Sequence, residues 1–204
     1  MQEIKESLIE VRKAYRLIFD FQSRILDLIS YIKGKMNFDY SGGFVKYSNQ
    51  SPRNGSGGLK QWSWDWLNFY FYEFHFKQKI INSDKINFSI FIICDTGYFE
   101  TKKDNSISKL EIEKYKNPED SNTKLIFVAG KNVWSYFSDS NWNNSDFTLK
   151  ESDVRVDDKG VMIFKSYNLE RFADEVSANE VLKDFIDFAN FNSIPLEILE
   201  RDFI

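Results

Sequence analysis

Residues 59–95 read LKQWSWDWLNFYFYEFHFKQKIINSDKINFSIFIICD, and this stretch contains three of the five Trp residues of the chain. Aromatic and β-branched side chains of this kind pack well on a pleated, half-buried surface. Between the two apolar runs, the turn-forming residues cluster in Asn82-Ser83-Asp84-Lys85. We therefore predict a long antiparallel hairpin, with roughly residues 68–80 paired to residues 86–95.

Both faces of this predicted hairpin are apolar. Phe69 and Phe71 alternate with Tyr70 and Tyr72, whereas a strand with one face in water would alternate apolar with polar residues. The pattern predicts a central pair of strands that is covered on both sides. A helix over residues 59–77 is the competing interpretation, and we rank it second because aromatic side chains lose rotamer freedom in a helix.

The composition of the whole chain limits its class. A length of 204 residues fits a single domain, 1–204, and a net charge of −4 disfavours generic nucleic-acid binding. The single cysteine, Cys94, precludes an internal disulfide and suits a reducing compartment. No apolar run is long enough to span a bilayer, and the charged first residues do not read as a signal peptide. We expect a cytoplasmic protein, and the abundance of Asn, Ile and Lys suggests a bacterial or phage origin.

Residues 3–33 have the spacing of one long helix. Apolar side chains recur at alternating intervals of four and three residues, interrupted only by Gln22: Ile4, Leu8, Val11, Tyr15, Ile18, Ile25, Ile29 and Ile32. Gly34 stands where the residue after the helix end is expected. Two interpretations stay open, a helix that lies across a sheet and a helix that dimerises as a coiled coil.

The rest of the chain predicts strands followed by helices. Expected elements are a short hairpin around Ser41-Gly42-Gly43, strands at 110–113 and 125–129, a hairpin of 154–156 with 161–164, a short helix from Asn168, a helix opened by a capping box at 177–180 and ending near 190, and a last helix at 196–203. The predicted fold class is α+β. It consists of an antiparallel sheet of about five to seven strands (a β meander over about 36–165), with the long N-terminal helix and the C-terminal helices of 168–203 packed on it.

Asp95-Thr96-Gly97 follows the apolar run and resembles the active-site triplet of aspartic proteases, a resemblance that covers three residues. Such chemistry needs two carboxylates that share a proton, so the resemblance implies a dimer. A turn at the end of a strand explains the same residues. Asp95 with Glu111 or Glu113 also resembles, in part, the pattern of PD-(D/E)xK nucleases, in which a metal ion sits between strand carboxylates.

Glu73, His75 and Cys94 form a second candidate group. If the hairpin turns on Ser83-Asp84, Glu73 lies opposite Cys94 and His75 lies diagonal to it on the same face. A thiol beside an imidazole that a carboxylate orients is the arrangement of a cysteine nucleophile. The alternative is that His75, the only His of the chain, is a hydrogen-bonded core residue. A one-residue error in register moves Cys94 to the other face.

Trp62, Trp64 and Trp66 share one face if their segment is a strand, and they follow the Gly-rich loop 51–58, which contains Arg53. Three Trp on one face form a candidate protein-contact surface, and burial in the core is the equal alternative. One His and one Cys are too few for a zinc site, so the sequence predicts no metal and no cofactor.

The favoured function is a partner-binding domain without chemistry of its own. Its predicted partner is a protein or a second copy of the chain, with no nucleic acid and no membrane involved. The alternative function is a metal-dependent hydrolase or nuclease that uses Asp95 and a neighbouring strand carboxylate.

Overall fold

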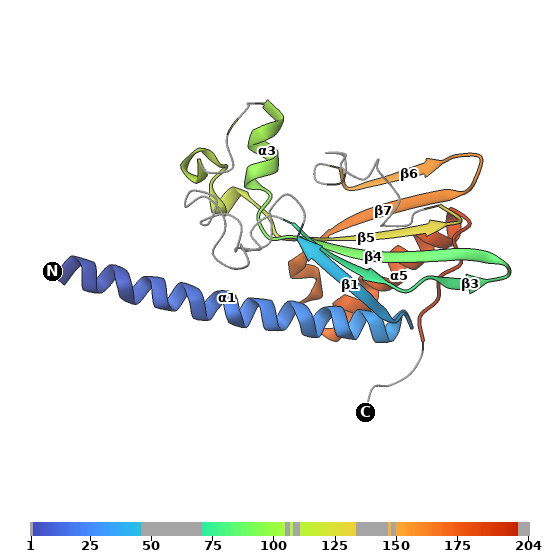
Figure 1. Cartoon of the computed structure of the whole chain (residues 1–204), viewed down its shortest axis with the longest axis horizontal. Coiled ribbons are helices and arrows are strands. Elements are labelled where there is room, and N and C mark those ends of the chain that lie inside the picture. The colour runs from blue at the N-terminus through green and yellow to red at the C-terminus, as the bar shows by residue number, and fades with distance from the viewer. Residues whose placement is uncertain are drawn as a thin grey trace, which may run out of the picture. The chain divides into compact units, whose positions relative to one another are not determined.

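The computed structural model describes residues 2–45, 71–104, 107, 111–133, 147 and 150–199 (Figure 1). The chain forms two compact units. One comprises Met1–Asn37 with Leu199–Ile204, and the other comprises Phe38–Ile198.

The first unit is built on a long helix, α1, from Gln2 to Lys35. The predicted helix over 3–33 is therefore confirmed, but it ends later than expected. Gly34 lies inside its last turn, and Asn37 instead adopts the left-handed conformation that stops the helix, with φ of 55°. Lys33 and Lys35 lie at the carbonyl end, where positive charge suits the helix dipole. The backbone N–H of Leu199 donates to the carbonyl of Lys35 at 2.8 Å.

The second unit contains a seven-stranded sheet in which every strand pair is antiparallel. The order is β1-β2-β4-β5-β7-β6, with β3 also paired to β4. The strands are β1 Tyr40–Val45, β2 Tyr72–Phe76, β3 Lys79–Ile81, β4 Asp84–Ile93, β5 Lys124–Lys131, β6 Ser152–Val156 and β7 Val161–Asn168. The predicted α+β class with an antiparallel sheet is confirmed.

The predicted hairpin is confirmed over its described residues, but its first strand is divided into β2 and β3 at residues 77–78. Strand β4 pairs with both β2 and β3, and the turn residues Asn82 and Ser83 have φ of 51° and 72°. Two positive φ angles in a two-residue loop match the twist of the strands. The hairpin predicted around residues 41–43 is wrong, because these residues lie within the single strand β1, which has a register shift between Tyr40 and Gly42.

Both faces of the sheet are covered, as predicted from the apolar residues on both faces of the hairpin. On one face lies helix α5, Glu175–Phe191, whose Phe185 packs on Phe88 of β4 and Phe127 of β5 (Figure 1). The other face carries a second cluster, to which helix α3, Gly97–Asp104, contributes Tyr98 and Phe99. Phe71, which directly precedes β2, also belongs to this cluster. The strand residues of the cluster are Phe91, Ile93, Ile126, Val128, Met162 and Phe164.

The start of α5 differs from the prediction. Asp174 is the N-cap: its carboxylate accepts the backbone N–H of Ser177 at 2.8 Å, and the Ser177 hydroxyl accepts the backbone N–H of Asp174 at 3.3 Å. The capping box therefore spans residues 174–177, and the prediction of residues 177–180 is wrong by one turn. The prediction places Ser177 at the N-cap with Glu180 three residues later, whereas Ser177 takes the N3 position and Asp174 is the N-cap.

Shorter elements complete the unit. The described part of the strand predicted at 110–113, residues 111–113, instead leads into the 3-10 helix η2, Ile112–Lys114. A second 3-10 turn, η3, covers Pro118–Asp120. The short helix after Asn168 is confirmed as η5, Leu169–Phe172. Residues 194–199 are not helical, so the last predicted helix is wrong over its described part. None of the described helices combines the length and apolar composition that crossing a membrane requires.

Candidate functional site

A hydrogen-bonded chain of three side chains crosses the inner part of the hairpin. Glu73 and His75 point to the same face of β2 because they are two residues apart, and Ser89 of β4 lies directly opposite His75. The Glu73 carboxylate lies 2.8 Å from His75 Nε2, and the Ser89 hydroxyl lies 2.8 Å from His75 Nδ1. All three side chains have 0% exposure. This group, Glu73–His75–Ser89, is called the His75 network below.

The chemistry of the His75 network follows from its acceptors. An ionised Glu73 only accepts, so it selects the imidazole tautomer that carries its proton on Nε2. In that tautomer Nδ1 is an acceptor, and the Ser89 hydroxyl donates to it. Hydroxyl, imidazole and carboxylate stand in the order that activates a serine nucleophile. With no exposed surface, however, Ser89 offers no approach to a substrate, and the network satisfies polar groups within an apolar core.

Cys94 is not part of this network. The observed register pairs Glu73 with Phe91, so the register expected from a turn on Ser83-Asp84 is wrong. Cys94 follows the end of β4 and is partly buried. Burial raises the pKa of its thiol to about 12, with a further contribution from the nearby Asp95 charge. The thiol is therefore protonated at neutral pH, which is opposite to the requirement for a nucleophile.

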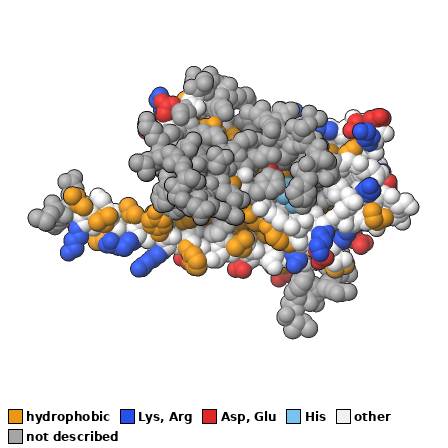
Figure 2. Space-filling model, in the orientation of Figure 1, with side chains coloured by type: hydrophobic (Ala, Val, Ile, Leu, Met, Phe, Trp, Pro, Cys, Tyr) orange, Lys and Arg blue, Asp and Glu red, His pale blue; other side chains and the backbone are white. Residues whose placement is uncertain are grey.

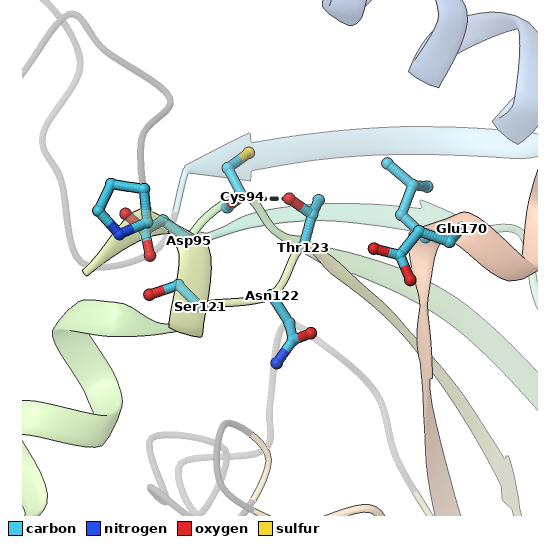
Figure 3. A pocket seen from close by; sticks show the side chains of 8 residues that line it. Cys94, Asp95, Ser121, Asn122, Thr123 and Glu170 are labelled. Atoms are coloured by element: carbon cyan, nitrogen blue, oxygen red, sulfur yellow. Dashed lines mark hydrogen bonds between the residues drawn. The ribbon is translucent and has the colours of Figure 1, made fainter. Parts of the chain in front are cut away.

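Cys94 and Asp95 instead line a cavity of about 480 Å³ at the end of the sheet (Figure 3). Asp95 and Glu170 lie on opposite sides of it, and Ser121, Asn122 and Thr123 form the wall between them (Figure 3). The Thr123 hydroxyl donates to the Cys94 carbonyl at 2.8 Å. Two carboxylates, those of Asp95 and Glu170, thus line the cavity together with the apolar side chains of Pro118 and Leu169.

Asp95 has a local structural role in this cavity wall. Its carboxylate accepts the backbone N–H of Gly97 at 2.7 Å, where the chain turns from β4 into α3. This bond is the behaviour expected of a turn residue. Among the described residues there is no group of three His, Cys, Asp or Glu side chains that would hold a metal ion.

The remaining carboxylates of the nuclease hypothesis lie elsewhere than predicted. Glu111 directly precedes η2 and pairs with Lys114, while Glu113 lies within η2 and is exposed. Neither residue belongs to a strand, so the predicted strand carboxylate beside Asp95 is not supplied by them. The candidate binding residues Trp62, Trp64, Trp66 and Arg53 lie outside the residues that the structure describes.

Among the residues that the structure describes, α1 carries a regularly spaced series of exposed apolar side chains, and Ile9, Leu17 and Phe19 are also exposed, outside this series. Ile4, Leu8, Val11, Tyr15 and Ile18 are 65%, 50%, 48%, 52% and 49% exposed, and they occupy one face of the helix. These five residues are called the α1 stripe below. Figure 2 shows apolar side chains along this helix with basic side chains beside them. Farther along the helix, the same face carries Ile25, Ile29 and Ile32, which are buried.

Sequence reasoning found the α1 stripe as a pattern but not its exposure. Periodicity is the same for a helix that packs on a core and for one that presents its apolar face to a partner. The role of Ser89 was missed altogether. Its signal is a small polar residue inside the apolar run 86–94, which suggests a buried partner for another polar side chain.

Comparison with known proteins places the chain in a family. The family model described as PM0109 matches residues 1–193. The chain belongs to the PM0109 family. One relative, named "Uncharacterized protein PM0109", from Pasteurella multocida (strain Pm70), is 42% identical over 38 residues, which is 19% of each chain. The match thus spans about a fifth of that relative's length. No solved structure matches the chain.

Proposed function

We propose that this member of the PM0109 family is a protein-interaction domain and that the α1 stripe is its contact surface. The observation that carries the proposal is the exposure of five regularly spaced apolar side chains, each about half exposed or more. Contiguous apolar surface of this kind costs free energy in water, and in soluble proteins it marks sites that a partner covers. A stripe at intervals of four and three residues fits another helix.

The two other candidate sites lack features that catalysis or metal binding needs, and this favours an interaction domain. The His75 network is inaccessible, and the Cys94 thiol is protonated at neutral pH. The cavity has Cys94, Asp95 and Glu170 on its wall, but among the described residues no three His, Cys, Asp or Glu side chains form a group that could hold a metal ion. A cytoplasmic location, suggested by the single cysteine, belongs to the same proposal.

The test is affinity purification of the tagged protein from its own host, followed by reconstitution with the purified partner. The variant Leu8→Glu with Tyr15→Glu places two charges in the α1 stripe and is expected to abolish binding. Arg24→Glu, at an exposed position on the opposite face of the helix, is the matched control and is expected to bind normally. Equal binding by all three proteins, or no partner that reconstitutes, would contradict the proposal.

A further inference from the structure

We propose that the α1 stripe binds the α1 stripe of a second copy of this chain, with the two helices parallel and in register. This inference rests on the proposed function, because it names the partner of the same surface. The surface is long enough for a short coiled coil. Residues 4–18 span about 21 Å at 1.5 Å per residue, which is about four helical turns.

The spacing of the stripe is that of a coiled-coil seam. Ile4, Val11 and Ile18 are seven residues apart, and Leu8 and Tyr15 fill the alternate positions between them. Beyond Ile18 the next seam position is Gln22, a polar residue of intermediate exposure. After it the seam positions Ile25, Ile29 and Ile32 are buried, although Leu26, which lies in line with Leu8, is 50% exposed. The seam available to a second copy therefore ends near Gln22.

The charges beside the stripe distinguish between the two orientations. Lys5, Arg12 and Arg16 are exposed along one side, and Glu10 is exposed on the other. In an antiparallel pair each side meets its own counterpart, which would bring the two basic sides together. In a parallel pair the basic side of one helix meets the side of the other that carries Glu10. The surface is therefore complementary to itself only in the parallel orientation.

The side that carries Glu10 also leaves room for these contacts. Between Glu10 and the seam lie Ser7 and Ala14, two of the smallest side chains. The long side chain of Arg12 from the second copy extends over them toward Glu10. The Glu10 carboxylate already accepts a bond from Lys13 Nζ at 2.8 Å, so it is held on the outer surface of the helix. Exposed ion pairs add little affinity, so the apolar seam supplies the attraction and the charges select the orientation.

Disulfide trapping tests the orientation on the full chain. Ile4→Cys and Ile18→Cys are prepared separately and oxidised under mild conditions. A parallel, in-register pair joins two copies of the same variant, so each variant alone forms a covalent dimer. We expect about tenfold more dimer than with Lys13→Cys on the opposite face, because pairing raises the effective thiol concentration. Wild type is a second control, since burial keeps the Cys94 thiol protonated, with a pKa of about 12.

Charge reversal tests the same arrangement without new thiols. Glu10→Arg and Arg12→Glu each place like charges together in the parallel pair. Each is expected to weaken the dimer about two- to fivefold in sedimentation equilibrium, which is the range of exposed ion pairs. The double variant restores opposite charges and is expected to regain the wild-type dissociation constant. If the double variant loses as much dimer affinity as the two single variants combined, the parallel arrangement is overturned.

The outcomes separate this inference from the function on which it rests. If a covalent dimer forms only when Ile4→Cys is mixed with Ile18→Cys, the two helices are antiparallel and the proposed parallel orientation is overturned. A wild-type chain that stays monomeric at high concentration, with no trapping above Lys13→Cys, would overturn the second copy as partner. The proposed function would still stand if a different purified protein bound wild type and not the Leu8→Glu, Tyr15→Glu variant. If neither a second copy nor another protein bound, both proposals would fail.

Discussion

Ser89 stabilises the fold through a single hydroxyl group. It lies 2.8 Å from His75 Nδ1 in a site with no solvent exposure, while the Glu73 carboxylate lies 2.8 Å from Nε2. Buried polar groups in such a network depend on one another, because water cannot replace a lost partner. The network also connects β2 with β4, the two strands at the middle of the hairpin. Its geometry therefore fixes strand register as well as contributing free energy.

Ser89→Ala is expected to lower the free energy of unfolding by about 1–3 kcal/mol, the cost of taking a hydrogen-bond partner from a buried group. Urea unfolding followed by tryptophan fluorescence measures the change. Ser152→Ala, at an exposed position of β6, is the control and is expected to change stability by less than about 0.5 kcal/mol. Equal stability of both variants would show that the Ser89 hydroxyl contributes nothing to the fold.

The Cys94 thiol gives a second test at the same scale. With a pKa of about 12, roughly one thiol in ten thousand is ionised at pH 8, compared with about a quarter for an ordinary cysteine. Alkylation by iodoacetamide, followed by mass spectrometry, is expected to be at least about a thousandfold slower in the native protein than in urea. The folded-state pKa of the Cys94 thiol is raised above its unfolded value, so the unfolded chain loses this proton first. The free energy of unfolding is therefore at its full value below pH 8.5, roughly the unfolded pKa, and falls as pH rises toward 12. Rapid alkylation of Cys94 in the native protein would contradict a raised pKa for its thiol.

At the scale of elements, helix α5 illustrates how strongly position on a helix determines energetic importance. Phe185 is fully buried against Phe88 and Phe127, whereas Phe191 is 87% exposed at the last turn. Phe185→Ala is expected to cost about 3–5 kcal/mol, because it leaves a cavity between α5 and the sheet. Phe191→Ala makes the same chemical change and is expected to cost less than about 0.5 kcal/mol. Thermal unfolding of the two variants measures the difference, and similar midpoints would place Phe185 outside the core.

The same scale shows what the sequence could predict. Helix α1, strand β5 and the two hairpins at 79–93 and 152–168 follow from periodicity and turn residues, which act locally. The start of α5 was misplaced by one turn because Asp174 and Ser177 form the capping box in place of Ser177 and Glu180. Local patterns therefore gave the elements reliably and their ends less well.

The candidate site was harder to predict because it depends on register. The turn lies at Asn82-Ser83, and residues 77–78 separate β2 from β3, so β2 is shifted along β4 from the expected pairing. This shift places Ser89 rather than Cys94 beside His75. The sequence correctly grouped Glu73 with His75, since two residues on one strand share a face whatever the register. The polar Ser89 inside an apolar run suggests a buried partner, but only the register shows that this partner is His75.

For the whole molecule, folding and association are expected to be separable. All seven strands and α5 belong to the unit Phe38–Ile198, whereas the α1 stripe belongs to the unit that contains Met1–Asn37. Contacts that hold the sheet together are buried, and those proposed for a second copy are exposed in the single chain. Substitutions in the α1 stripe should therefore change association and leave the unfolding of the sheet unit unaltered.

Hydrogen exchange measured by mass spectrometry tests this separation in one experiment. Amides of β4 and β5 are expected to exchange most slowly at every protein concentration, because each of these strands is bonded on both sides and their side chains are buried. Amides of residues 4–18 are expected to exchange rapidly in dilute solution and to slow as concentration rises, since pairing would protect a helix whose apolar face is otherwise in water. Leu8→Glu should remove this dependence on concentration without changing exchange in β4. The contrary result would be high protection of residues 4–18 in dilute protein, with the same protection in Leu8→Glu. It would mean that this helix is stabilised within one chain and that a partner does not recognise the α1 stripe.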